Sequence, residues 1–111
     1  MKFDNLIMSD AQIIEMNLDL SSSKFILRTW DDKEWLIIFE EVLAIQSFSV
    51  EGVDLSHLVI GNDDPFKTST MEYFHDENFE RFLCFNFYGV WVEKPLLKII
   101  ATGSYEIIEN S

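Results

Sequence analysis

The chain has 111 residues, of which 48% are hydrophobic and 14% aromatic; this suits one domain with a substantial core and argues against disorder. Twenty acidic residues against eight basic ones give a net charge of -12, which argues against binding to nucleic-acid phosphates or anionic membranes. A single cysteine, Cys84, excludes an internal disulfide, and the lack of a leader-like N-terminus or of ~20 consecutive apolar residues predicts a cytoplasmic protein.

The first predicted strand spans residues 12–20, where apolar and polar residues alternate. Ile14 and Met16 fall on the apolar face, and acidic residues fall on the other face. This alternation is typical of a strand with one buried side and one side in water. Three serines at 21–23 then predict a turn.

The next two predicted strands are residues 24–30 and 34–39. The polar residues 31–33 between them form a compact hairpin connection. Apolar side chains occupy both faces of 34–39. Since only a strand with neighbours on all sides buries both faces, we expect 34–39 to be central in its sheet.

The middle of the chain is less regular. Residues 40–50 are interpreted as a strand that follows a β-bulge, and residues 55–60 as a further short strand. The Gly-Asn-Asp-Asp-Pro cluster at 61–65 ends that strand, because glycine and proline interrupt regular pairing. Residues 66–80 show the least pattern, so we expect a surface loop with a short helical turn at 69–74.

Two long apolar stretches, residues 81–92 and 96–108, dominate the C-terminal part. Both change side at every second residue, and the short polar break between them predicts that they are antiparallel neighbours. Gly89 and Gly103 lie inside these stretches and are expected to mark bends or close packing.

Together these elements predict one mainly β domain over residues 1–111. We expect an antiparallel β-sandwich or partly open barrel of about seven or eight strands, with at most one short helix. In a barrel, aromatic side chains could line a ligand cavity, and the chain would then be a small-molecule carrier. The candidate lining residues are Phe82, Phe85, Phe87, Tyr88, Trp91 and Tyr105.

The candidate reactive groups form no recognisable reaction centre. Ser56 and His57 are adjacent in a predicted strand, so they are expected to point to opposite faces and not to form a dyad. His75 is followed by two acids, but consecutive residues rarely converge on one metal ion. The acidic pairs in turns match no calcium-loop spacing. We therefore expect no enzymatic activity, no metal and no cofactor.

Three segments and one residue give the chain a family likeness: residues 55–58, 84–87 and 95–101, and Trp91. With these segments the chain resembles the small, acidic, single-domain proteins encoded in bacterial genomes, some of which are immunity proteins of polymorphic toxin systems. The likeness extends from Trp35 to the end of the chain. It implies that the protein binds and blocks a cognate toxin, and it implies no catalytic residues.

The leading hypothesis is a non-enzymatic protein-binding module that presents carboxylates and a few aromatics to a basic protein surface. The candidate partner-binding residues are Asp31, Asp32, Glu34, Asp63, Asp64, Tyr73, Asp76 and Glu77. The alternatives are the small-molecule carrier and a subunit of a larger assembly that joins through a strand edge. The sequence indicates neither the partner nor the oligomeric state.

Overall fold

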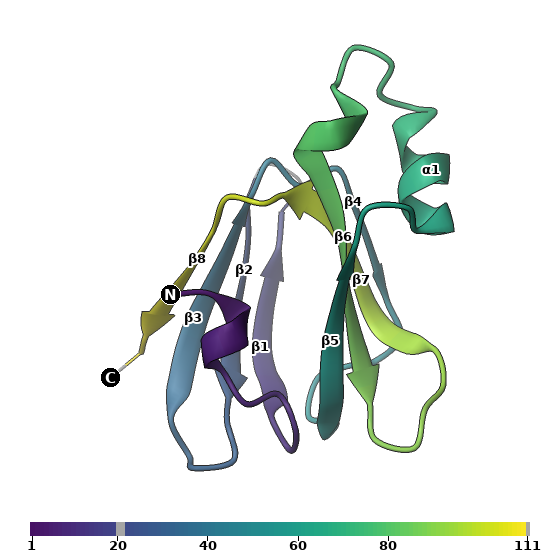
Figure 1. Cartoon of the computed structure of the whole chain (residues 1–111). Coiled ribbons are helices and arrows are strands. Elements are labelled where there is room, and N and C mark those ends of the chain that lie inside the picture. Colours follow the sequence, from purple (N-terminus) through teal and green to yellow (C-terminus); the bar gives the residue numbers. More distant parts are fainter. Residues whose placement is uncertain (20–21, 111) are drawn as a thin grey trace.

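The computed structural model describes residues 1–19 and 22–110, and these residues form two four-stranded antiparallel sheets packed face to face (Figure 1). In spatial order, the first sheet consists of β1 (Gln12–Leu18), β2 (Ser22–Arg28), β3 (Glu34–Glu40) and β8 (Tyr105–Glu109). The second sheet consists of β4 (Ala44–Ser47), β7 (Pro95–Thr102), β6 (Phe82–Gly89) and β5 (Leu55–Gly61). The sandwich form of the predicted β fold is therefore confirmed.

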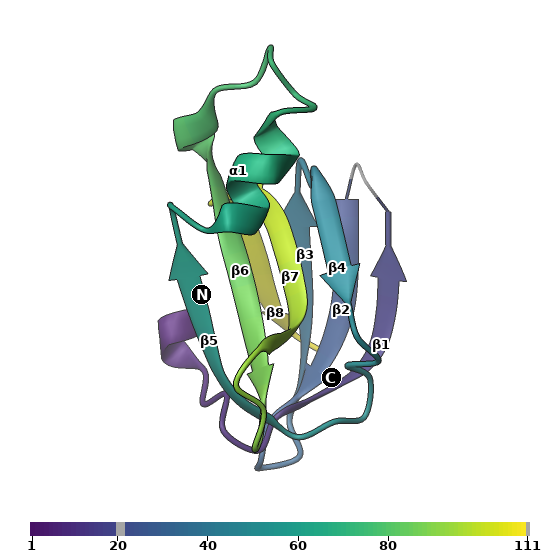
Figure 2. The same ribbon diagram turned by 90° about the vertical axis from the view of Figure 1, so that its right-hand side faces the viewer.

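One α-helix lies in the described part of the chain, α1 (Pro65–Met71), and it covers one end of the outer face of the second sheet (Figure 2). Two 3₁₀ turns accompany it, η1 (Phe3–Asn5) near the N-terminus and η2 (Phe79–Arg81) before β6. The short helical turn expected at 69–74 begins earlier than predicted. Asp64 caps it and Pro65 occupies its first position, where a missing N–H does no harm.

Strand β3 has the central position that its two apolar faces predict. It pairs with β2 on one side and with β8 on the other. Ile37 and Phe39 are fully buried between the sheets, whereas Leu36 and Ile38 on the outer face are half-buried. The difference arises because α1 covers the second sheet only, so the outer face of the first sheet meets water.

The single strand predicted at 96–108 is wrong, because the chain changes sheets within it. β7 pairs with β6 in the second sheet, as expected for antiparallel neighbours, but β8 pairs with β3 in the first. The change occurs at Gly103 and Ser104, so the bend expected at Gly103 separates two strands. Gly89 shows the close packing expected of it, since a Cβ there would lie 2.6 Å from Leu96 Cδ1.

Strand β1 departs from simple alternation at a bulge. Its register against β2 shifts between Ile13 and Glu15, so Ile13 faces the core and Ile14 is displaced from the inner face where the pattern placed it. Met16 keeps its predicted inner position. Of the turn predicted at 21–23, Ser22 and Ser23 belong to β2, and residues 20–21 lie outside the described residues.

Aromatic rings fill the space between the sheets. Phe39 contacts Phe85 with centroids 4.8 Å apart, and Phe25 meets Phe87 edge-on at 5.6 Å. From η1, the ring of Phe3 joins them and is only 4% exposed. Half of the aromatic residues proposed to line a cavity lie elsewhere: Phe82 lies under α1, Tyr88 lies on the outer face and Trp91 is 99% exposed in a turn.

Candidate partner-binding surface

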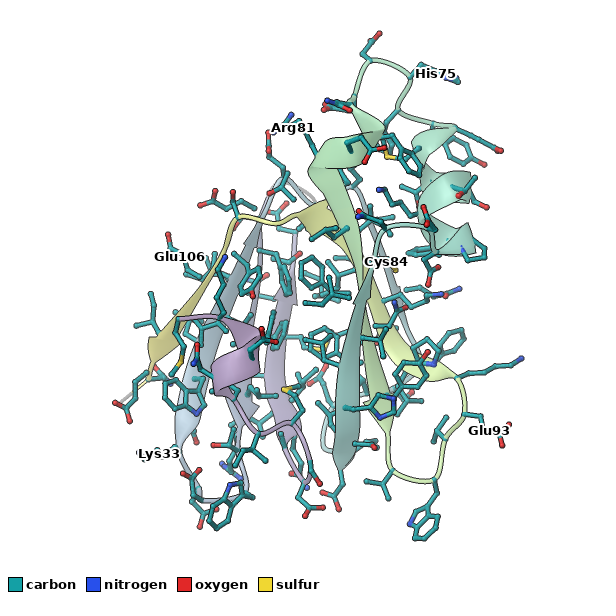
Figure 3. The ribbon with its side chains drawn as sticks, viewed as in Figure 1. Lys33, His75, Arg81, Cys84, Glu93 and Glu106 are labelled. Atoms are coloured by element: carbon teal, nitrogen blue, oxygen red, sulfur yellow. The ribbon has the colours of Figure 1, made fainter. Side chains whose placement is uncertain are left out.

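Residues 65–81, which we call the cover segment, contain α1 and η2 and rise above one end of the sandwich (Figure 3). Its start is fixed by Asp64. The Asp64 carboxylate accepts hydrogen bonds from the Phe66 N–H at 2.8 Å and from Lys98 Nζ at 3.0 Å. Partial burial alone would raise the pKa of this carboxyl, but these two donors hold it below its ordinary value.

The side of α1 that faces the sheet carries apolar residues beside the buried Lys67 and Thr70. Phe66 and Met71 pack against Phe82, Cys84 and Ile100, a small second core on the outer face of the second sheet. Burial raises the pKa of the Cys84 thiol to about 12, and the nearby Asp64 carboxylate adds to the rise. The thiol is therefore protonated and inert at neutral pH, as expected for a cysteine that serves packing.

A hollow of about 420 Å³ lies between α1 and the edge strand β4, and we call it the β4 hollow. Leu43 and Ala44 line it from the strand side, and Phe66, Tyr73 and Phe74 line it from the helix side. Tyr73 is 84% exposed at its rim. A large aromatic ring held in water beside an apolar hollow is the kind of side chain that anchors protein interfaces.

Exposed acidic side chains are numerous on the cover segment and at the end of β3. The cover segment carries four exposed acids, and Glu40 and Glu41 follow at the end of β3. The four are Glu72, Asp76, Glu77 and Glu80. Within the described residues, the only ion pairs that these six acids form are those of Glu77 and Glu41 with Arg81. The remaining carboxylates face water and are available to a cationic partner.

The structure divides the predicted partner-binding residues between opposite ends of the molecule. Tyr73, Asp76 and Glu77 lie together on the cover segment, close to the labelled His75 (Figure 3). Asp63 and Asp64 immediately precede the same segment. The other three, Asp31, Asp32 and Glu34, lie in or beside the β2–β3 turn around the labelled Lys33, at the far end (Figure 3).

Two of the three residues at the far end, Asp31 and Glu34, form contacts with neighbouring residues. Glu34 pairs with Arg28 at 3.1 Å across the hairpin. The Thr29 hydroxyl donates to Asp31 at 2.6 Å, and this bond lowers the pKa of the Asp31 carboxyl. Across the residues that the structure describes, no three acidic, histidine or cysteine side chains gather as a metal site would require.

Two features of this surface were not predicted from the sequence. The apolar lining from Leu43 and Ala44 was not predicted, because only the position of α1 makes it a hollow. Lys67, within the cover segment, is fully buried although lysine is normally exposed. The Asp64-Pro65 pair is a recognisable helix start, so the sequence could have placed Lys67 in a helix that begins at Pro65.

The expectation that Ser56 and His57 point to opposite faces is wrong. Ser56 Oγ lies 2.9 Å from His57 Nδ1, because a bulge between Leu55 and His57 breaks the alternation of β5. The imidazole stacks on Tyr88 with centroids 4.5 Å apart. Among the described residues no carboxylate hydrogen-bonds to this histidine, so the pair lacks the group that orients the base of a hydrolytic triad.

The chain matches no protein-family model, and neither the curated proteins nor the solved structures contain a significant match to it. Of the helices in the described residues, none has the length and apolar character needed to cross a membrane.

Proposed function

We propose that this protein is a non-enzymatic binding module that holds a basic protein partner on the cover segment and the adjoining β4 hollow. One observation carries the proposal: Tyr73 stands 84% exposed at the rim of an apolar hollow, on a segment that also carries four exposed acids. In this arrangement the aromatic ring anchors the complex, and the acids raise the rate of encounter with a cationic surface.

The net charge of -12 supports the same choice of partner. A field of this sign attracts basic surfaces and repels phosphates and anionic lipids over about one Debye length. In its specific form, the proposal is a cytoplasmic, toxin-neutralising protein that covers a basic surface of its cognate toxin. The two alternatives, a small-molecule carrier and a subunit of a larger assembly, remain predictions.

The experiment begins with affinity capture from the native host, followed by purification of the captured protein and measurement of association rates. We expect the association rate to fall about tenfold or more between about 50 and about 300 mM salt, because exposed charges are screened. A rate that does not change with salt would contradict electrostatic steering.

Two aromatic substitutions locate the surface. Tyr73→Ala should weaken binding by about 2 kcal/mol or more, the usual effect of truncating an aromatic anchor. Trp30→Ala is the matched control, because Trp30 is 62% exposed but lies in the β2–β3 turn at the far end. Equal losses from the two variants, or a loss from Trp30→Ala alone, would place the interface elsewhere.

A further inference from the structure

The two sheets are offset, so that β1 has no strand facing it along part of its length. Viewed onto the second sheet, β1 projects beyond the edge strand β4 (Figure 2). Residues near Glu51 cover only the start of β1, where Glu51 bridges to Ile13. Further along, Leu18 is on the same inner side as Met16 and is nevertheless 41% exposed.

On the opposite side of the sandwich, at β5, the N-terminal segment of the chain covers the offset between the sheets. There the N-terminal segment packs beside β5: Asp10 N–H donates to the Leu55 carbonyl, and Leu55 N–H donates to the Ala11 carbonyl. Phe3 fills the space behind it. The contrast leaves the inner side of β1 at Met16 and Leu18 as the place where the two-layer structure is incomplete.

Strand β4 has a backbone edge that faces this place. Phe48 N–H donates to the Leu96 carbonyl directly opposite it, at 2.8 Å. Bonded and non-bonded positions alternate in an antiparallel pair, so the N–H and C=O groups of Ile45 and Ser47 point away from β7. Strand β4 is short, and none of its four residues, Ala44–Ser47, is charged or a proline, the residue types that most often protect an exposed edge.

We propose that a strand of the partner adds to the free edge of β4 and completes the second sheet opposite β1. Alternate side chains of that strand would point inward onto Met16, Leu18 and Ile45, and the others would point outward toward the β4 hollow. This inference rests on the proposed function and states how the partner is held.

Charge decides which strand fits. A second copy of this chain would bring another net charge of -12 to a molecule that already carries the same charge. An extended segment in which apolar residues alternate with lysine or arginine suits this site, since its apolar face covers Leu18 and its cations are attracted by the net negative charge of the chain. The occupant is therefore a basic segment of a partner protein.

The test uses a peptide of about nine residues in which isoleucine and lysine alternate, followed by amide hydrogen exchange on the intact protein. We expect exchange at Ile45 and Ser47 to slow by about tenfold or more when the peptide is present at saturation. The same peptide with glutamate in place of lysine, or with a central proline, should leave exchange unchanged. Protection at β5 or β8 in place of β4, or no protection at Ile45 and Ser47, would overturn the proposal.

Two matched variants separate this inference from the proposed function. Leu18→Lys puts a charge on the inner side of β1 and should abolish peptide protection. Asn17→Lys adds the same charge on the outer side and should not. If the captured partner is released by Tyr73→Ala but not by Leu18→Lys, the binding function stands and strand addition fails. A chain that sediments as a dimer with Ile45 and Ser47 already protected would show that a second copy fills the place, and it would overturn the basic occupant.

Discussion

The ammonium group of Lys67 lies 3.7 Å from the centroid of the Phe79 ring, and it has no hydrogen-bond acceptor among the described residues. Lys67 is on α1 and Phe79 begins η2, so this contact joins the two ends of the cover segment. A cation above an aromatic face is attracted by about 2 kcal/mol when both are shielded from water. Desolvation of an ammonium costs several kcal/mol, so the ring offsets only part of that cost.

Replacement of Lys67 by methionine should therefore stabilise the protein. Lys67→Met keeps most of the side-chain volume and removes the buried charge, and we expect a gain of about 1–2 kcal/mol in the free energy of unfolding. Urea unfolding measures this directly. Phe79→Leu should cost more in the wild type than in the Lys67→Met background, by about 0.5–2 kcal/mol. A destabilised Lys67→Met variant would show that the ammonium has a stronger partner than the ring.

The bond between Asp64 and Lys98 predicts a pH dependence of stability. The folded-state pKa of Asp64 is below its ordinary value of 3.8, so its contribution is fully present above about that pH. It is lost as pH falls through the lower folded-state pKa. Asp64→Asn keeps a residue that caps helices and removes the charge, and it should cost about 1–2 kcal/mol at pH 7.

Urea unfolding of this variant from neutral to acidic pH provides the check. The difference in unfolding free energy between wild type and Asp64→Asn should shrink as the pH falls below about 4. The adjacent, exposed Asp63 supplies the control, since Asp63→Asn removes an equal charge without breaking the bond to Lys98. A difference that stays constant with pH would contradict the role given to the Asp64 charge.

Cys84 should be chemically silent in the folded protein. It is fully buried and its pKa is raised to about 12, so almost no thiolate exists at neutral pH. We expect an aromatic disulfide reagent to label it at least about 100-fold more slowly in the native chain than in urea. Rapid labelling under native conditions would mean that the cover segment opens readily and exposes the small core beneath α1.

Two glycine substitutions test the packing at the end of β6. Gly89→Ala would place a Cβ 2.6 Å from Leu96 Cδ1, and the leucine must shift to make room. We expect a loss of about 1–2 kcal/mol in the free energy of unfolding, which is typical of overpacking. Gly61→Ala is the control: nothing lies within 4 Å of its added Cβ, so this variant should be neutral or slightly stabilised. Equal effects at both positions would argue against the Leu96 contact.

The alternation of apolar residues predicted the class of fold, because period-two patterns report which faces are buried. It placed β3 at the centre of its sheet and β6 beside β7. It could not show that β7 and β8 belong to different sheets, since the pattern resumes after Gly103 and carries no record of which strand lies opposite. The bulges at Ile13 and Leu55 were missed because a bulge is defined by pairing with a second strand.

The candidate site was only partly accessible from sequence. Turn composition identified exposed acids and Tyr73, but it gave no distance between them, so Asp31 and Tyr73 were grouped although the fold separates them. The β4 hollow depends on two segments far apart along the chain, Leu43 on one side and Phe74 on the other. Such a juxtaposition arises from topology and is invisible to a local pattern.

The contact between Phe3 and Tyr105 has a consequence for the order of folding. Their rings lie 4.7 Å apart, and the Phe3 N–H donates to the Tyr105 hydroxyl, although 102 positions separate the two residues. A loop of this length is closed late, because its entropy must be given up before the contact is gained. We infer that the N-terminal segment docks onto a sandwich that is already assembled. The same segment should be the first to detach when the protein begins to open.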